Sequence, residues 1–197
     1  MTATARKLAS LAAALAACAP ATKLTSVQVV PESPRARVTN VLVAGLVKNP
    51  SARTSYEVEM VKALRAAGVR AEASQDLLPI GQAPTREALQ KLVAEHGFDA
   101  ALVGMLVDSR TDVRAVPPDP GYGFYGYYGW ASSYAYSPGY LETTTRVTVE
   151  TRLFRTAGET RAVFATNSES IDPNSVAEVT QPLSQLVVAQ LRKDGFL

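Results

Sequence analysis

The sequence has a single cysteine and a single histidine, and this scarcity excludes several kinds of site. One cysteine cannot form a disulfide within the chain, and it cannot supply the two or more thiolates of the usual cysteine-based zinc sites. A serine–histidine–aspartate triad would have to use His96, and the chain has no G-x-S-x-G motif to hold a nucleophile. Because His96 falls on the apolar side of a predicted helix, near its end, we expect it to pack or cap there.

The chain also has no run of lysine or arginine, which argues against nucleic acid as a partner. The formal charge is +2, and both excess positive charges lie at Arg6 and Lys7. Without residues 1–17 the basic and acidic residues balance at 18 each. Nucleic-acid-binding proteins usually carry a basic face that neutralises phosphates, so we expect no nucleic acid to bind.

No cluster of histidine, cysteine or carboxylate residues suggests a metal site. Glu57 with Glu59, and Asp108 with Asp112, are spaced like the solvent-exposed ends of helices and strands. Residues 121–126 spell G-x-G-x-x-G, but no strand leads into them and no helix follows, so they do not predict a nucleotide site. We therefore expect no catalytic residues, no metal and no cofactor. The alternative is an envelope hydrolase of glycan or peptide, whose paired carboxylates can lie far apart in the sequence.

The first 20 residues, MTATARKLASLAAALAACAP, have the parts of an export signal. Arg6 and Lys7 form its positive end, and Leu8–Leu15 is an apolar segment. This segment is far shorter than the roughly 20 residues that span a bilayer permanently. It ends at the only cysteine, Cys18. An alanine-rich helix that holds a cysteine by chance is the alternative explanation.

The segment Leu15–Cys18 resembles the lipobox of bacterial lipoproteins. The resemblance implies that the chain is cut between Ala17 and Cys18, and that Cys18 then carries diacylglycerol and an N-acyl chain. Two or three acyl chains hold a protein stably on a membrane. Ala19 follows where inner-membrane lipoproteins of enteric bacteria carry aspartate. The resemblance therefore implies an outer-membrane protein that faces the periplasm, with the inner membrane or the cell surface as alternatives.

Three regions follow from this signal: a signal peptide at residues 1–17, a lipidated tether at 18–37 and a single α/β domain at 38–197. The tether is polar and is interrupted by Pro20, Pro31 and Pro34. Within it, Ser26–Val30 is a candidate edge strand.

The first half of the domain repeats the order strand, helix, glycine, strand, which is typical of βαβ units. Continuous apolar runs predict strands that are covered on both faces of the sheet. The predicted strands are Val41–Val47, a segment from Val69 and the run Asp99–Val107. The first predicted helix opens at the capping-box pair Thr54 and Glu57 and stops at Gly68. The second predicted helix runs from Pro84–Thr85 to Gly97.

The second half has a different pattern. Thr143–Phe154 alternates apolar and polar residues, and Arg161–Ile171 returns after a turn at Ala157–Glu159, so an antiparallel hairpin is expected. A last helix runs from about Ser175 to Lys193. The chain as a whole predicts a βαβαβββα-type mixed sheet, of the α/β or α+β class, with helices mainly on one face.

One segment, Pro117–Leu141, is unusually rich in tyrosine and glycine. It lies between two predicted neighbouring strands, and such loops lie on the surface. Tyrosine and tryptophan favour protein interfaces, sugar stacking and the membrane headgroup zone. We therefore predict a contact surface here, with a loop that packs only on its own domain as the alternative. Its aromatic residues are Tyr122, Phe124, Tyr125, Tyr127, Tyr128, Trp130, Tyr134, Tyr136 and Tyr140.

With this element order the chain resembles small Gram-negative lipoproteins whose cores are similar to the N-terminal domain of TolB and to the CsgG and LpoB lipoproteins. The segments that carry the resemblance are Val41–Val47, Arg53 with Tyr56–Glu57, Ala66–Val69 and Gly97–Val103. The sequence shows no long secretion-pore hairpin with membrane-like alternation. The resemblance implies action through protein contact: a non-catalytic binding, accessory or scaffolding module with an envelope protein or peptidoglycan as partner. A self-assembling envelope component is a further possibility.

Overall fold

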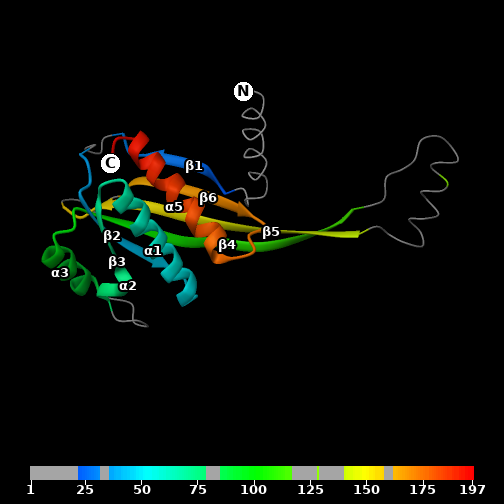
Figure 1. Cartoon of the computed structure of the whole chain (residues 1–197), viewed down its shortest axis with the longest axis horizontal. Coiled ribbons are helices and arrows are strands. Elements are labelled where there is room, and N and C mark those ends of the chain that lie inside the picture. Colours follow the sequence, from blue (N-terminus) through cyan, green and yellow to red (C-terminus); the bar gives the residue numbers. More distant parts are fainter. Residues whose placement is uncertain (1–21, 32–35, 79–84, 117–127, 129–139, 158–161) are drawn as a thin grey trace, which may run out of the picture.

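A six-stranded mixed sheet, in the order β1-β6-β5-β4-β2-β3, forms the centre of the chain (Figure 1). The computed structural model describes residues 22–31, 36–78, 85–116, 128, 140–157 and 162–197. Its strands are β1 Lys23–Val29, β2 Asn40–Leu46, β3 Arg70–Ala73, β4 Ala100–Val116, β5 Tyr140–Arg155 and β6 Ala162–Ile171. Its helices are α1 Pro50–Ala66, α2 Ser74–Leu77, α3 Arg86–His96 and α5 Val176–Lys193.

The predicted mixed α/β fold is confirmed. β2 lies between β3 and β4 and is parallel to both, so the two predicted βαβ units are present. β4, β5 and β6 then pair antiparallel in chain order, as the alternating sequence indicated. α5 follows β6 and closes the fold.

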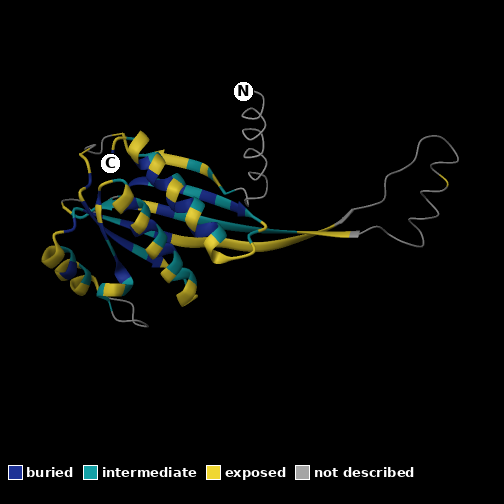
Figure 2. Cartoon of the chain, in the orientation of Figure 1, coloured by how far each residue is buried: buried dark blue, intermediate teal, exposed yellow. Residues whose placement is uncertain are grey.

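The two faces of the sheet are covered by different helices (Figure 2). In β2, Val41 and Val43 point to the main core together with Leu64 of α1 and Leu183 of α5, while the intervening Leu42 packs with α3 on the opposite face. The period of two along a strand explains this division. The two long helices therefore share one face, as expected, and α3 covers part of the other.

The helix starts follow side-chain caps, one of which the sequence pattern misplaced. α3 and α5 begin where the sequence predicts, and the side chains of Thr85 and Ser175 cap them by accepting hydrogen bonds from the backbone three residues on. The predicted capping box of Thr54 and Glu57 is wrong. α1 begins one turn earlier at Pro50, where Asn49 accepts two backbone hydrogen bonds. Proline suits this first position because it has no backbone N–H, and an N–H here would have no partner within the helix.

The edge strand considered for Ser26–Val30 is present as β1, and it shortens the expected tether. β1 pairs antiparallel with β6 from Lys23 to Val29, so these residues belong to the sheet. Cys18 lies five residues before Lys23 and, with the rest of residues 1–21, outside the described residues. Within the described ranges, no helix is both long and apolar enough to cross a membrane.

Candidate interaction site

β4 and β5 extend well past the other strands of the sheet. β2 pairs with β4 only as far as Leu46 opposite Met105, and β6 pairs with β5 only as far as Ile171 opposite Arg146. Beyond these points β4 and β5 pair only with each other in the described part of the chain, up to Val116 opposite Tyr140. We call this projecting hairpin, formed by residues 106–116 and 140–145, the arm (Figure 1).

The arm corrects two expectations from the sequence. The buried run predicted for Asp99–Val107 ends at Gly104, and every β4 residue from Met105 to Arg114 is exposed. The hairpin is also longer than the predicted strands Asp99–Val107 and Thr143–Phe154. The apolar pattern of the sequence does not indicate this length, because charged and hydroxyl side chains alternate in β4 after Val107. Its faces do not show the apolar alternation of a membrane-spanning hairpin.

One face of the arm carries charges of alternating sign. Asp108, Arg110 and Asp112 follow each other at every second residue of β4, so their side chains share a face. The Arg110 guanidinium lies 3.9 Å from Asp108 and 3.6 Å from Asp112. Each of these side chains is at least half exposed, so the ion pairs are weak in water.

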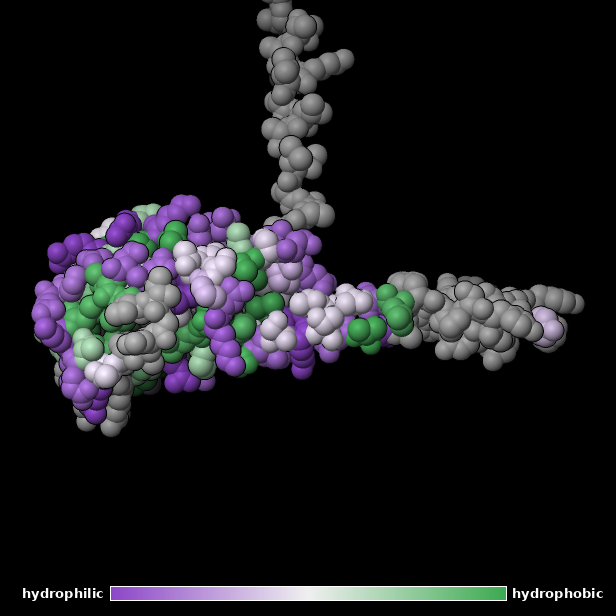
Figure 3. All heavy atoms as spheres, turned by 90° about the horizontal axis from the view of Figure 1, so that it is seen from below, coloured by the Kyte–Doolittle hydropathy of each residue, from purple (hydrophilic) through white to green (hydrophobic). Residues whose placement is uncertain are grey.

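The other face of the arm carries hydroxyl and apolar side chains. Thr111 and Thr145 form a cross-strand hydrogen bond between their hydroxyl oxygens, at 3.1 Å. Val113 is 61% exposed and Leu141 is 70% exposed. Most of the arm surface is pale or purple in the hydropathy view, with a hydrophobic group toward its outer end (Figure 3). Exposed apolar side chains beside a free strand edge are typical of a contact surface.

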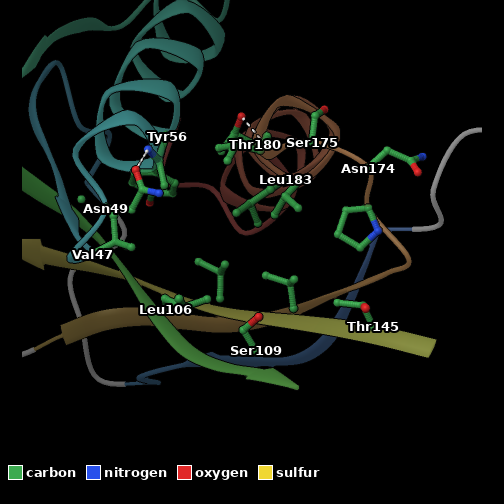
Figure 4. A pocket seen from close by; sticks show the side chains of 18 residues that line it. Val47, Asn49, Tyr56, Leu106, Ser109, Thr145, Asn174, Ser175, Thr180 and Leu183 are labelled. Carbon is green, nitrogen blue, oxygen red and sulfur yellow. Dashed lines mark hydrogen bonds between the residues drawn. The ribbon is translucent and has the colours of Figure 1, made fainter. Parts of the chain in front are cut away.

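A cavity of about 380 Å³ lies at the root of the arm (Figure 4). It is bounded by the first turns of α1 and α5 and by β4 and β5. Its wall is mainly apolar, with Leu106, Val147 and Leu183 among the lining residues, and the hydroxyl groups of Ser109 and Thr180 interrupt it. The described lining contains no carboxylate, histidine or cysteine.

Tyr56 closes the inner end of this cavity, between two glycines that pair across β2 and β4. Gly45 lies opposite Gly104 in the parallel ladder, and a Cβ on Gly104 would come within 2.2 Å of the Tyr56 ring. The hydroxyl oxygen of Tyr56 lies 3.5 Å from that of Thr151. Burial raises the pKa of Tyr56 far above its usual 10.0, so the phenol stays neutral.

Glu57 is fully buried, contrary to the solvent-exposed position expected for it. Its carboxylate accepts hydrogen bonds from the backbone N–H groups of Gly45 and Gln75, both at 2.9 Å, and from the Ser74 hydroxyl at 2.8 Å. It also lies 3.0 Å from the Arg53 Nε. All its partners come from the protein's own framework, so Glu57 joins α1, β2 and α2 rather than facing a substrate.

The other carboxylates singled out in the sequence are not paired in a cleft. Asp108 and Asp112 lie exposed on the arm, as expected. A second, wider depression between α3 and the sheet is lined by one described carboxylate, Asp99. Asp99 accepts hydrogen bonds from the backbone N–H groups of Thr39 and Asn40. No group of three or more potential metal ligands occurs in the described ranges.

His96 has the packing role expected from its position. Its ring stacks on Phe98 with 5.4 Å between centroids, and its Nδ1 lies 3.4 Å from a Glu72 carboxylate oxygen. α3 ends immediately after it, at Gly97, which adopts a left-handed conformation.

The predicted aromatic contact surface falls largely on residues whose placement is not described. Tyr140 begins β5, and Tyr128 is 66% exposed. The connection between the strands is therefore residues 117–139, slightly shorter than predicted. β4 and β5 are neighbours, so the prediction that this segment joins adjacent strands is confirmed. The remaining aromatic residues lie outside the described residues: Tyr122, Phe124, Tyr125, Tyr127, Trp130, Tyr134 and Tyr136.

Solved structures that resemble this chain include bacterial lipoproteins. The PelC dodecamer from Paraburkholderia phytofirmans has a TM-score of 0.46 at 13% identity, over 89% of this chain and 98% of that chain. The lipoprotein GNA1162 from Neisseria meningitidis has a TM-score of 0.44 at 15% identity, over 79% and 99%. A minor lipoprotein from Acinetobacter baumannii has a TM-score of 0.34 at 13% identity, over 79% and 94%.

These similarities are distant and concern the fold alone. No protein-family model matches the sequence, and no curated protein matches it either. The similarity to TolB, CsgG and LpoB stays a prediction.

Proposed function

We propose that this protein is a non-catalytic envelope lipoprotein, held on the outer membrane by lipid at Cys18, that acts through protein contact at the arm. The observation that carries the proposal is the projecting arm, whose β4 strand is exposed from Met105 to Arg114. An unpaired strand edge presents a row of backbone hydrogen-bonding groups and readily pairs with another chain. The partner is another envelope protein, and no cofactor takes part.

The strand register brings the start of β1 and the arm to the same end of the sheet. Lys23, the first residue of β1, lies opposite Glu169 of β6. Glu169 in turn lies opposite Thr148, which lies opposite Asp108 at the root of the arm. Five extended residues from Cys18 to Lys23 reach at most about 17 Å. The proposed lipid anchor therefore keeps the root of the arm close to the membrane surface.

Photo-cross-linking in the producing cell tests the proposal. A photoreactive amino acid at Val113, exposed on the arm, is expected to give a protein adduct of defined mass. The matched control is Val58, an exposed valine of α1, which is expected to give none. Adducts with lipid or glycan only, or equal adducts at both positions, would contradict a protein-contact role for the arm. Mass spectrometry of the mature N-terminus tests the lipid at Cys18 separately.

A further inference from the structure

The outer edge of β4 is free over a long stretch. β2 stops opposite Met105, so the β4 backbone from Leu106 to Val116 has no strand on its outer side among the described residues. A register shift places a bulge between Leu106 and Asp108, after which the strand is regular up to Val116. Natural sheets usually protect such an edge with charges, with bulges or by pairing it.

The charges on this edge follow a regular order, which protection of the edge from other strands would not by itself require. From Asp108 onward, every second residue is charged and the signs alternate, through Arg110 and Asp112 to Arg114. The centre of this pattern is Thr111, which is also the midpoint between Leu106 and Val116 at the two ends of the free edge.

We infer that the β4 edge pairs antiparallel with the β4 edge of a second copy, about a two-fold axis at Thr111. This inference rests on the proposed function, because it names the partner of the same arm. The pairing joins two arms into one four-stranded sheet. Asp108 then lies opposite Arg114 of the second copy, and Arg110 opposite Asp112. The two-fold axis generates each of these pairs twice, so all the charges of the pattern are matched.

The alternative registers are less favourable. An axis at Ser109 or at Val113 matches only half of the charges of the pattern, and the other neighbouring registers oppose like charges. An axis at Arg110 places that residue opposite itself and Asp108 opposite Asp112. An axis at Asp112 places that aspartate opposite itself and Arg110 opposite Arg114. A parallel, in-register pair sets every charge against its own copy. Opposite charges directly across an antiparallel pair stabilise it, and like charges destabilise it.

The uncharged face agrees with the same register. Thr111 lies opposite Thr111 of the second copy, and cross-strand threonine pairs are favourable. Ser109 lies opposite Val113, so the exposed valine gains a neighbour. Two copies anchored in one membrane also meet at high effective concentration, which favours a weak edge-to-edge contact.

Single cysteines on the arm test the register, because the proposed lipid at Cys18 leaves the natural protein without a free thiol. The full-length protein is produced in its own cells, and the membranes are treated with an oxidant and examined on a non-reducing gel. Thr111→Cys is expected to form a disulfide-linked dimer, because the axis places this residue against itself. Val113→Cys and Ser109→Cys are each expected to give little dimer alone, but to cross-link when the two variants are made together. The unsubstituted protein is the control for Cys18.

Charge reversal provides a second test that does not depend on one residue's geometry. One variant carries Asp108→Arg and Asp112→Arg, and the other carries Arg110→Asp and Arg114→Asp, each with Thr111→Cys. Each variant alone is expected to cross-link roughly tenfold less, because every pair becomes a like-charge pair. Making both variants together is expected to restore the dimer, which also shows that neither variant is misfolded.

The inference would be overturned if Val113→Cys alone gave more dimer than Thr111→Cys. It would also be overturned if either charge-reversed variant still formed a dimer alone. Loss of self-cross-linking need not remove the proposed function. If Val113 forms a photo-adduct with a different protein while Thr111→Cys stays monomeric, the arm is a contact element and self-pairing is wrong. If neither experiment gives a protein adduct, both are wrong.

Discussion

At the scale of single residues, Tyr56 packs closely between Gly45 and Gly104. A Cβ on Gly104 would lie 2.2 Å from the ring, whereas one on Gly45 would lie 3.3 Å from it. Real Cβ atoms do not approach as closely as the first distance, so only Gly104 lacks space for a methyl group.

Gly104→Ala is therefore expected to lower the free energy of unfolding by about 1–3 kcal/mol, the usual cost of overpacking a core. Gly45→Ala is the matched control, since it adds the same methyl group on the neighbouring strand and is expected to cost clearly less. Urea unfolding of the two purified proteins in detergent gives both values. Equal losses would mean that the ring does not fill the space at Gly104.

Tyr56 also predicts a loss of stability in alkali. Burial raises its pKa in the folded state, while the unfolded residue ionises near 10.0. The contribution of Tyr56 to the free energy of unfolding is therefore fully present below pH 10. It falls as the pH rises above 10, because only the unfolded state loses the phenol proton. The slope is at most about 1.4 kcal/mol per pH unit.

Tyr56→Phe is expected to flatten the fall in unfolding free energy between pH 9 and pH 11 (roughly one unit on each side of the usual pKa). The unsubstituted protein is the control. If Tyr56→Phe shows the same dependence of unfolding free energy on pH, Tyr56 is not the buried phenol responsible.

Residue-level prediction from the sequence succeeded where the signal is local. The caps at Thr85 and Ser175 and the packing of His96 follow from spacing along one helix. Glu57 was wrongly predicted to be exposed, because its hydrogen-bond partners at Gly45 and Gln75 lie on other elements and no local sequence pattern indicates them. An arginine four residues before it, at Arg53, was the one available sign.

At the scale of elements, Glu57 is the joint between α1, the end of β2 and the start of α2. Glu57→Gln is expected to lower the free energy of unfolding by about 3 kcal/mol, because a buried donor loses its acceptor and Arg53 loses its counter-charge. This is the lower end of the range, since the Arg53 side chain is 24% exposed.

Glu59→Gln is the matched control on the same helix. Its carboxylate lies 3.6 Å from the exposed Lys62, and such pairs contribute little. Urea unfolding should show a change below about 0.5 kcal/mol. A comparable loss in both variants would show that the buried hydrogen bonds of Glu57 are not what joins these elements.

The order of elements could be predicted, but the reach of β4 could not. Apolar periodicity located the buried part of each strand, from Val41 to Val43 and from Ala100 to Gly104. Periodicity reports burial, so it ends where burial ends, and the exposed stretch from Asp108 to Arg114 was not predicted as a strand. Only the pairing with β5 shows that the strand continues.

At the scale of the whole molecule, the structure separates a packed body from an exposed arm. The buried residues of the main core lie chiefly on β2 to β6 and on α1 and α5, and none of the arm residues whose burial is described is buried. Stability and contact can therefore be altered independently. The first residue of β1, Lys23, and the root of the arm lie at one end of the sheet, which suits a protein anchored at Cys18 that makes its contacts close to the membrane surface.

Shortening the arm tests this account most directly. Replacing residues 112–144 by Asn-Gly keeps Thr111 opposite Thr145 and closes the hairpin with a favourable two-residue turn. We predict that the free energy of unfolding stays that of the native protein, while the complexes captured by formaldehyde in the producing cells disappear. Full retention of those complexes by the shortened protein would contradict the account, because the arm would then not be the contact element.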